Sequence, residues 1–533
     1  MLPDANPAEE RPTDLKRNAF EKEMREVKAP ETAEIEEKKT KLSEGESDRP
    51  ESPSLVKQAK DKPQCKTQAI PTTNWEAGRK RSVSFNSSMM ANLQLESQSK
   101  SSWIVSLLTF KDDIGFDTVK NIVGGRLLQI PRFRSTLDTS SSPLSFVEVD
   151  LDEIDQDYHY KVHSPNKVAD KAQVDDFLGH LFDDFDPDMS KPLWQLHYFP
   201  KVEGGKSCLI ANMSHIIGDG IAMVEVLRKI LDPEESGARK TLSQPARRER
   251  PKRFGFWKKL KIFAAGLWEG ITAVASIPDK PNTLRLVDTN VTSATKRCVF
   301  TESIPLEKVK MVKNLYEGAT LNDVMMTMLN LTLRAYFQTV DDKDALQNEI
   351  RAQFPINMRS AEQVDPFRDG DSCNCFSMGT MKLFANEPGD PSQVFFKTKT
   401  LLDEIKHSPA PLVGWYAAWA GIRILFRSLV NKLILGAGAK ATAMLSNVPG
   451  PQDVVHIGGY ELDDLRFLAF TPVGFYVGLL TYNGSLSASF CVDSELADPS
   501  LVAKHWVPQF ESFLKHAAKK AAANGGKIPA PLL

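Results

Sequence analysis

His215 and Asp219 are the two side chains whose types and spacing most readily suggest chemistry. They stand four positions apart, and Gly220 follows Asp219 directly. A neutral imidazole can accept a proton near pH 7, and a carboxylate four residues on can fold back to orient the ring or to fix its loop. The alternative interpretation is a core histidine followed by an ordinary aspartate N-cap of a helix. Residue types alone do not decide between the two.

The sequence around His215 predicts a strand, a tight turn and a helix. Residues 208–213 form an apolar run of strand length, and residues 221–231 carry apolar side chains at helical spacing. His215 is therefore expected at the end of a buried strand, at the mouth of a cleft. Gly218 and Gly220 are expected to give the turn its backbone freedom and to leave room for a substrate.

Composition limits the kind of protein this can be. The chain has 533 residues, of which 41% are hydrophobic and 26% charged, as in globular proteins with two or three domains. A net charge of −2 gives no general reason to expect nucleic acid as a partner. No apolar run reaches the roughly 18 residues that a membrane span needs, so we expect a soluble or peripheral protein.

The six cysteines and the histidines give no sign of a disulfide framework or a metal site. No two cysteines form a Cys-x-x-Cys pair and no secretory signal is recognisable, so all six are predicted to be reduced cytosolic thiols. His197 has no second histidine or carboxylate at metal-site spacing, and we predict a strand or core residue there rather than a metal ligand.

Changes in composition divide the chain into four parts. Residues 1–84 are rich in Glu, Lys, Pro and Ser and are predicted to be a disordered tail. Residues 85–245 form a first half with the His215 motif, and residues 296–533 form a second half. Residues 246–295 are predicted to be a linker with an amphipathic helix.

Two apolar helical segments suggest contact with lipid. The helix predicted at 254–275 combines Trp257 and Trp268 with a lysine cluster, which suits either a membrane interface or packing within the protein. Residues 412–435 are a second candidate for an interfacial or substrate-entry helix. In the same half, residues 446–451 are predicted to be a turn cluster, and Asn483-Gly484 is predicted to connect a hairpin.

Several motifs, in order along the chain, resemble the bifunctional wax ester synthase/diacylglycerol acyltransferase family of the coenzyme A-dependent acyltransferase superfamily. They are Pro192-Leu193-Trp194, His215-x-x-x-Asp219-Gly220, Asn322-Asp323, Pro355-x-x-x-Arg359, Ser446-Asn447-Val448-Pro449-Gly450-Pro451 and the segment from Tyr482 to Asp493. The superfamily motif begins with two histidines, and Ser214 stands at the first of these positions.

The resemblance implies an α/β fold of mixed sheets, with two chloramphenicol-acetyltransferase-like halves and a tunnel between them. It implies acyl-CoA as co-substrate with no cofactor or metal, and a long-chain alcohol or diacylglycerol as acceptor, giving wax esters or triacylglycerol. The implied location is peripheral, at the cytoplasmic face of the endoplasmic reticulum or on lipid droplets, with the cytosol as the alternative.

The resemblance also assigns roles to residues. His215 would be the general base, and Asp219 would hold the loop against an arginine, for which Arg359 is the candidate. The predicted substrate-binding residues are Gly220, Asn322, Arg359 and Asn447. Either asparagine could hydrogen-bond the substrate or the developing oxyanion, and the alternative is turn and cap chemistry.

Three functions stay open at this point. The first is transfer of a fatty acyl group to an alcohol or diacylglycerol. The second is another acyltransferase of the same fold with a different acceptor. The third is a catalytically silent lipid-binding protein, for which Ser214 is the support.

Overall fold

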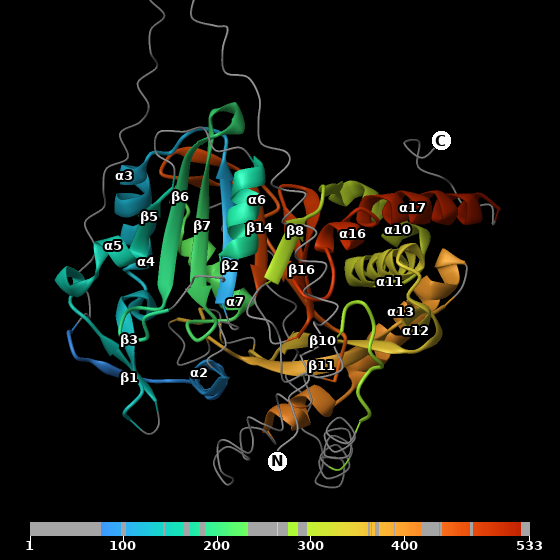
Figure 1. Ribbon diagram of the computed structural model, residues 1–533, viewed down its shortest axis with the longest axis horizontal. Helices are drawn as coiled ribbons and strands as arrows, with labels where there is room; N and C mark the ends of the chain where they lie inside the picture. The colour runs from blue at the N-terminus through green and yellow to red at the C-terminus, as the bar shows by residue number, and fades with distance from the viewer. Residues whose placement is uncertain are drawn as a thin grey trace, which may run out of the picture. The chain divides into compact units, whose positions relative to one another are not determined.

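The described residues of the computed structural model form a six-stranded sheet, a seven-stranded sheet and a small three-stranded sheet (Figure 1). The structure describes residues 76–97, 103–141, 144–163, 171–181, 187–232, 276–285, 296–360, 363, 365–367, 373–387, 390–416, 440–469 and 473–523, and positions 264 and 436 singly. All of them belong to the unit Pro63–Leu533.

The six-stranded sheet carries the strand that leads to His215. Its strands run in the order β13 (His456–Ile457), β14 (Tyr460–Ala469), β2 (Trp103–Phe110), β7 (Lys206–Ser214), β6 (Trp194–Val202) and β5 (Tyr160–Val162). β7 is almost wholly buried and pairs antiparallel with β2 and β6. β13 and β14 come from the second half of the chain. The predicted division into an N-terminal and a C-terminal half therefore does not coincide with the sheets.

The seven-stranded sheet is built from the second half of the chain. Its order is β11 (Phe376–Leu383), β10 (Ile350–Asn357), β12 (Ala443–Pro449), β15 (Phe475–Tyr482), β16 (Ser485–Asp493) and β8 (Lys296–Phe300), and β9 (Ile304–Pro305) also pairs with β16. The pairs of β12 with β10 and with β15 are parallel and the others antiparallel, so the sheet is mixed, as predicted.

Each face of this sheet belongs to a different core. In β15, Phe475, Val477 and Leu479 join the core of the helices α10 (Leu306–Leu315), α11 (Leu321–Thr339), α13 (Pro391–His407) and α17 (Trp506–Ala523) (Figure 1). The alternate residues Tyr476, Leu480 and Tyr482 join the core of the six-stranded sheet. Successive side chains of a strand point to opposite faces, which is why every residue of β15 is buried.

The hairpin and the turn cluster predicted in this half have different outcomes. β15 and β16 are joined by Asn483 and Gly484 with φ of 44° and 66°, which confirms the predicted hairpin. The turn predicted at 446–451 is wrong for its first part, because Ser446, Asn447 and Val448 lie within β12. All three residues pair with the parallel strand β15, and this pairing outweighs the turn preference of Ser and Asn.

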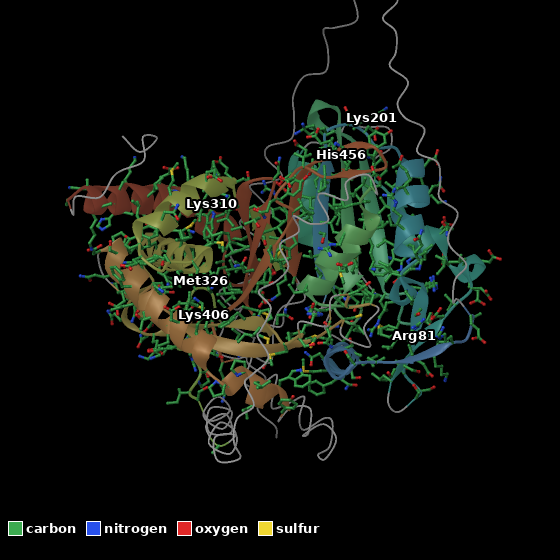
Figure 2. The ribbon with its side chains drawn as sticks, turned by 180° about the vertical axis from the view of Figure 1, so that it is seen from behind. Arg81, Lys201, Lys310, Met326, Lys406 and His456 are labelled. Atoms are coloured by element: carbon green, nitrogen blue, oxygen red, sulfur yellow. A yellow bond between two sulfur atoms is a disulfide. The ribbon has the colours of Figure 1, made fainter. Side chains whose placement is uncertain are left out.

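The predicted tail extends too far into the folded protein. β1 (Lys80–Ser82) pairs antiparallel with β4 (Ser145–Glu148), and Arg81, labelled in Figure 2, donates from Nε to the buried Glu148 at 2.7 Å. The Oγ of Ser84 then accepts from the backbone N–H of Ser87 at the start of α2 (Phe85–Ser97). The boundary at residue 84 is therefore wrong, and residues 1–75 lie outside the described part of the chain.

Removal of residues 1–75 is expected to leave the thermal stability nearly unchanged. Removal of residues 1–89 should lower it, because the second cut deletes Arg81, the Ser84 cap and the buried Ser87. Losing the cap alone costs about 1 kcal/mol. Thermal unfolding of the two truncated proteins beside the full chain measures the difference. Equal melting temperatures for all three would show that 76–89 do not belong to the fold.

The prediction that all cysteines are reduced is wrong for one pair. Cys298 of β8 and Cys491 of β16 face each other across antiparallel strands and form a disulfide. They are 193 residues apart in the sequence, so no local pattern reveals their proximity. Within the described residues Cys208, Cys373 and Cys375 form no disulfide, and Cys65 lies outside them.

The lipid-binding segments predicted from the sequence are mostly beyond what the structure describes. This holds for 254–275 apart from position 264, and for 417–435. Among the helices that are described, none combines the length and the apolar character of a membrane span.

Candidate functional site

His215 lies in the turn between β7 and α7 (Gly220–Ile230), as the sequence predicts. The backbone N–H of Ile217 closes the turn on the carbonyl of Ser214 at 3.0 Å. The Ser214 hydroxyl accepts from the N–H of Ile216 at 3.2 Å and lies 3.4 Å from Gln94 Oε1 of α2. Ser214 thus stabilises the turn with its own hydroxyl.

The glycines of this turn are required for close packing rather than for backbone freedom. Neither Gly218 nor Gly220 has a positive φ, so that part of the prediction is wrong. A Cβ at Gly218 would lie 2.6 Å from the Cβ of Ala222, and one at Gly220 would lie 3.0 Å from Cγ2 of Val448 in β12. The start of α7 therefore packs directly on the seven-stranded sheet. Contact of Gly220 with a substrate stays a prediction.

The His215 ring is half-buried and is held by residues at the start of β11 and just before it. Its Nδ1 lies 3.2 Å from Oδ1 of Asn374, and the ring of Phe376 meets it edge-on at 5.8 Å between centroids. Burial lowers the pKa of His215, and the charge of Asp219 and the hydrogen bonds of the ring to its own backbone and to Asn374 oppose this effect. The neutral imidazole, the form that can accept a proton, is therefore favoured at neutral pH.

Asp219 fixes the turn and does not hydrogen-bond the His215 ring. Its Oδ1 accepts from Nη2 of Arg359 at 2.9 Å and from the N–H of Ala222 at 3.1 Å, and its Oδ2 accepts from the N–H of Cys375 at 3.0 Å. The predicted ion pair with Arg359 is present, and both side chains are buried. Asp219 is the N-cap of α7 as well, so both interpretations of this residue hold.

Arg359 follows the end of β10, and its guanidinium hydrogen-bonds the His215 turn and residues next to that turn. Besides Asp219, its guanidinium donates to the carbonyl of Cys373 at 2.8 Å and to Oδ1 of Asn357 at 3.2 Å. The Cys373 carbonyl also accepts from the backbone N–H of Asp219 at 3.0 Å. These bonds give Arg359 a structural part in the turn, and its predicted contact with a substrate is untested.

Asn322 and Asn447 form a separate pair. In the described residues, Nδ2 of Asn447 donates to Oδ1 of Asn322 at 3.2 Å, and neither side chain hydrogen-bonds His215. Asn322 lies in the first turn of α11, whose start is capped because Thr320 and Asp323 exchange hydrogen bonds. Lys406, labelled in Figure 2, lies 3.6 Å from Asp323. Oxyanion binding by either asparagine stays a prediction.

Asn374 and Ser87 are site residues that the sequence reasoning missed. Nδ2 of Asn374 donates to the carbonyls of His215 and Ile216 at 2.7 and 3.2 Å and to Oγ of Ser87 at 2.9 Å. Asn86, the residue before Ser87, donates to the carbonyl of Phe376 at 2.6 Å. No local pattern marks these residues, because their partners are 158 to 290 positions away.

Two further observations concern metal binding, the alternative chemistry for the histidines. Among the residues that the structure describes, no group of three or more His, Cys, Asp or Glu side chains is placed to hold a metal ion. His197 is buried and its Nδ1 bonds to Nε2 of His163 at 3.0 Å, which confirms it as a core residue. Burial lowers the pKa of His197 to about 3.

Two relatives resemble the chain over 64% and 78% of its residues. A 360-residue stretch is 26% identical to a Mycobacterium tuberculosis protein named as a probable diacylglycerol O-acyltransferase, covering 64% of this chain and 76% of that one. The Arabidopsis thaliana wax ester synthase/diacylglycerol acyltransferase 3 is 22% identical over 451 residues, covering 78% and 91%.

Solved structures show the same fold. The wax ester synthase/diacylglycerol acyltransferase from Marinobacter aquaeolei superposes with a TM-score of 0.54 at 16% identity, over 83% of this chain and all of that one. A starter condensation domain of rhizomide synthetase, in complex with C8-CoA, gives 0.52 at 11% identity, over 82% and 94%. These likenesses confirm the predicted α/β class with two halves, and the tunnel between the halves stays a prediction.

Sequence models of one family match both halves of the chain. The wax ester synthase/diacylglycerol acyltransferase catalytic domain matches residues 90–325, which include His215, Asp219 and Asn322. The C-terminal domain of the same family matches residues 372–513, which include Asn374 and Asn447. Together the matches span more than half of the 533 residues. The chain belongs to the wax ester synthase/diacylglycerol acyltransferase family.

Proposed function

We propose that this chain is an acyl-CoA-dependent O-acyltransferase that moves a fatty acyl group to a long-chain alcohol or to diacylglycerol. The products would be wax esters and triacylglycerol. The observation that carries the proposal is the half-buried imidazole of His215, favoured in its neutral form on a turn that the buried Asp219–Arg359 ion pair holds in place. The family match and the names of the relatives support the choice of reaction.

In the proposed reaction, His215 accepts the proton of the acceptor hydroxyl while the oxygen attacks the thioester carbonyl. The new C–O bond forms and the C–S bond breaks, and the imidazolium returns its proton to the departing thiolate of coenzyme A. A thioester is already activated, so no covalent nucleophile is required. The bound coenzyme A derivative of the structurally similar condensation domain supports acyl-CoA as donor.

Ser214 does not favour the catalytically silent alternative. Its hydroxyl caps the turn at the N–H of Ile216, and the turn keeps His215, Asp219 and Arg359 in contact with their partners without a first histidine. The chemistry proposed for His215 requires none of the hydrogen bonds that a second imidazole would add.

Purified protein with labelled palmitoyl-CoA separates the three functions that the sequence leaves open. Offered hexadecanol, dioleoylglycerol and a short alcohol in parallel, it is expected to form ester with hexadecanol or dioleoylglycerol, because the family acts on such acceptors. Thin-layer chromatography of the labelled lipids measures this. Ester formed only with the short alcohol would indicate a different acceptor class. Binding of palmitoyl-CoA with no ester from any acceptor would leave the silent lipid-binding protein.

We also infer that the protein works at a lipid surface, at the cytoplasmic face of the endoplasmic reticulum or on lipid droplets. The support is the sequence at 254–275, where Trp257 and Trp268 occur with a lysine cluster near the start of the segment, a composition typical of interfacial helices. The apolar character of the proposed acceptors points the same way.

Changing Trp257 and Trp268 together to Glu is expected to release the protein from vesicles that contain anionic lipid. Added salt should weaken binding further, because it screens attraction to the neighbouring lysines. Co-sedimentation measures both effects. Phe396→Glu is a matched control, because Phe396 is a half-exposed aromatic residue of a described helix. Unchanged binding of the double variant would mean that the tryptophans face the protein interior.

A further inference from the structure

The orientation of the Asn374 side chain is determined by its surroundings. Its nitrogen faces the carbonyl oxygens of His215 and Ile216, at 2.7 and 3.2 Å. Carbonyl oxygens only accept hydrogen bonds, so the atom that faces them must be the NH₂ group. The other atom of the amide, Oδ1, must then be the one that faces the His215 ring.

This orientation determines which ring nitrogen of His215 carries the proton. Oδ1 of Asn374 lies 3.2 Å from Nδ1 and can only accept, so Nδ1 must donate. In the neutral ring Nε2 is then unprotonated, and its lone pair is free to take a proton. We propose that Asn374 is a positioning residue that fixes the Nδ1–H tautomer of His215 and thereby makes Nε2 the base. The mechanistic part of this inference rests on the function proposed above.

A neutral amide in this position differs in its effect from a carboxylate. A carboxylate beside Nδ1, as in the serine protease triad, orients the ring and also stabilises its protonated form. The amide of Asn374 orients the ring with a weaker influence on its charge. Asp219, the carboxylate whose charge acts on His215, is bonded to Arg359. The arrangement therefore combines a fixed tautomer with an imidazole that stays neutral, which suits attack on an activated thioester.

The side chain of Asn374 is also hydrogen-bonded to α2, which lies far from it in the sequence. Oγ of Ser87, a fully buried residue of α2, accepts from Nδ2 of Asn374 at 2.9 Å and from Nη1 of Arg132 at 3.4 Å. Arg132 also donates to the carbonyl of Ile216 at 3.3 Å. The amide is thus fixed on one side by the His215 turn and on the other by α2, so its Oδ1 has little freedom to leave Nδ1.

The test compares Asn374→Leu with a matched control, Asn330→Leu. Both asparagines are buried and use both ends of the amide, but the partners of Asn330 are Thr398 and Phe384, outside the site. Protein labelled with ¹⁵N-histidine is compared by NMR, because the two ring nitrogens have different shifts when protonated. The signals of His215 are those that disappear in His215→Gln.

We expect Nδ1–H in the wild type and a mixture of tautomers in Asn374→Leu. The kcat of Asn374→Leu should fall roughly tenfold or more, as loss of a single hydrogen bond of about 1.5 kcal/mol implies, with little change in KM for palmitoyl-CoA. Asn330→Leu should lower the melting temperature and leave the His215 signals unchanged. Asn374→Asp keeps an acceptor for Nδ1 but adds charge, so the acid limb of its pH–rate profile should move to higher pH.

Retention of a pure Nδ1–H tautomer in Asn374→Leu would overturn the inference, whatever the activity. If that variant does not fold, Ser87→Ala decides, because it removes one of the three acceptors that hold the amide. A partial shift of His215 toward the other tautomer supports the inference, and an unchanged spectrum refutes it. The NMR result does not depend on acyl transfer. A tautomer change in a protein that forms no ester would therefore contradict the proposed function. It would still support the role of Asn374 in orienting the His215 ring.

Discussion

Replacement of His215 by alanine is expected to lower the rate of ester formation by roughly 10²- to 10⁴-fold, the contribution of a general base. The fold should persist, because the ring is half-buried and, within the described part of the chain, Asn374 is the one side chain that it hydrogen-bonds. Binding of acyl-CoA should change little, since the histidine acts on the acceptor hydroxyl. Turnover at saturating palmitoyl-CoA, together with a binding isotherm for the variant, measures both quantities.

His456→Ala is the control for a general effect of losing a histidine. His456, labelled in Figure 2, is a half-buried residue of β13 in the same sheet as β7, and it is not part of the His215 turn. Its replacement should leave turnover close to that of the wild type. Wild-type turnover in His215→Ala would instead show that His215 is not the base, and the proposed reaction would need another proton acceptor.

Replacement of Asp219 by alanine should affect stability as strongly as rate. The change leaves the buried Arg359 without its carboxylate and removes the acceptors of the N–H groups of Ala222 and Cys375. Breaking a buried ion pair in this way costs about 3–5 kcal/mol. The turn should lose its fixed position, so ester formation should fall with the free energy of unfolding. Denaturant unfolding and turnover of the same preparation measure the two losses.

Asp498→Ala separates the ion pair from ordinary helix capping. Asp498 caps α16 (Pro499–Ala503) from an exposed position by accepting from the N–H of Ser500 at 2.8 Å, so its loss should cost only about 1 kcal/mol. Adding Arg359→Met to Asp219→Ala should recover part of the lost stability by removing the unpaired charge. A loss in Asp219→Ala no larger than in Asp498→Ala would contradict the importance of the ion pair.

Local pattern was sufficient for the elements that position His215. The apolar run before it and the helical spacing after it predict β7 and α7 within a few residues, because each depends on neighbours in the sequence. The cap at Thr320 and the hairpin at Asn483 were accessible for the same reason. Arg359 entered through the spacing of a family motif, since nothing in its immediate sequence indicates a partner 140 positions away.

The features that sequence reasoning missed depend on distant parts of the chain. Asn374 meets Ser87 across 287 positions, and β12 is a strand because β10 pairs with its start and β15 pairs with its whole length. The segment 446–448 has the composition of a turn, and only these neighbours reveal its conformation. Gly218 shows the same limit: its residue type predicts backbone freedom, whereas the space taken by Ala222 is what requires a glycine.

The pairing of β14 with β2 has a consequence for how the protein is made. β2 is among the first strands to leave the ribosome, yet one of its edges stays open until Tyr460–Ala469 has been synthesised. An open strand edge readily pairs with other chains, so the nascent protein passes through a stage that depends on chaperones for protection from aggregation. The same pairing means that a gene cut within 246–295 would give a first fragment with an incomplete sheet around β7. The sheet that carries the His215 turn is therefore complete only after residue 469 has been synthesised.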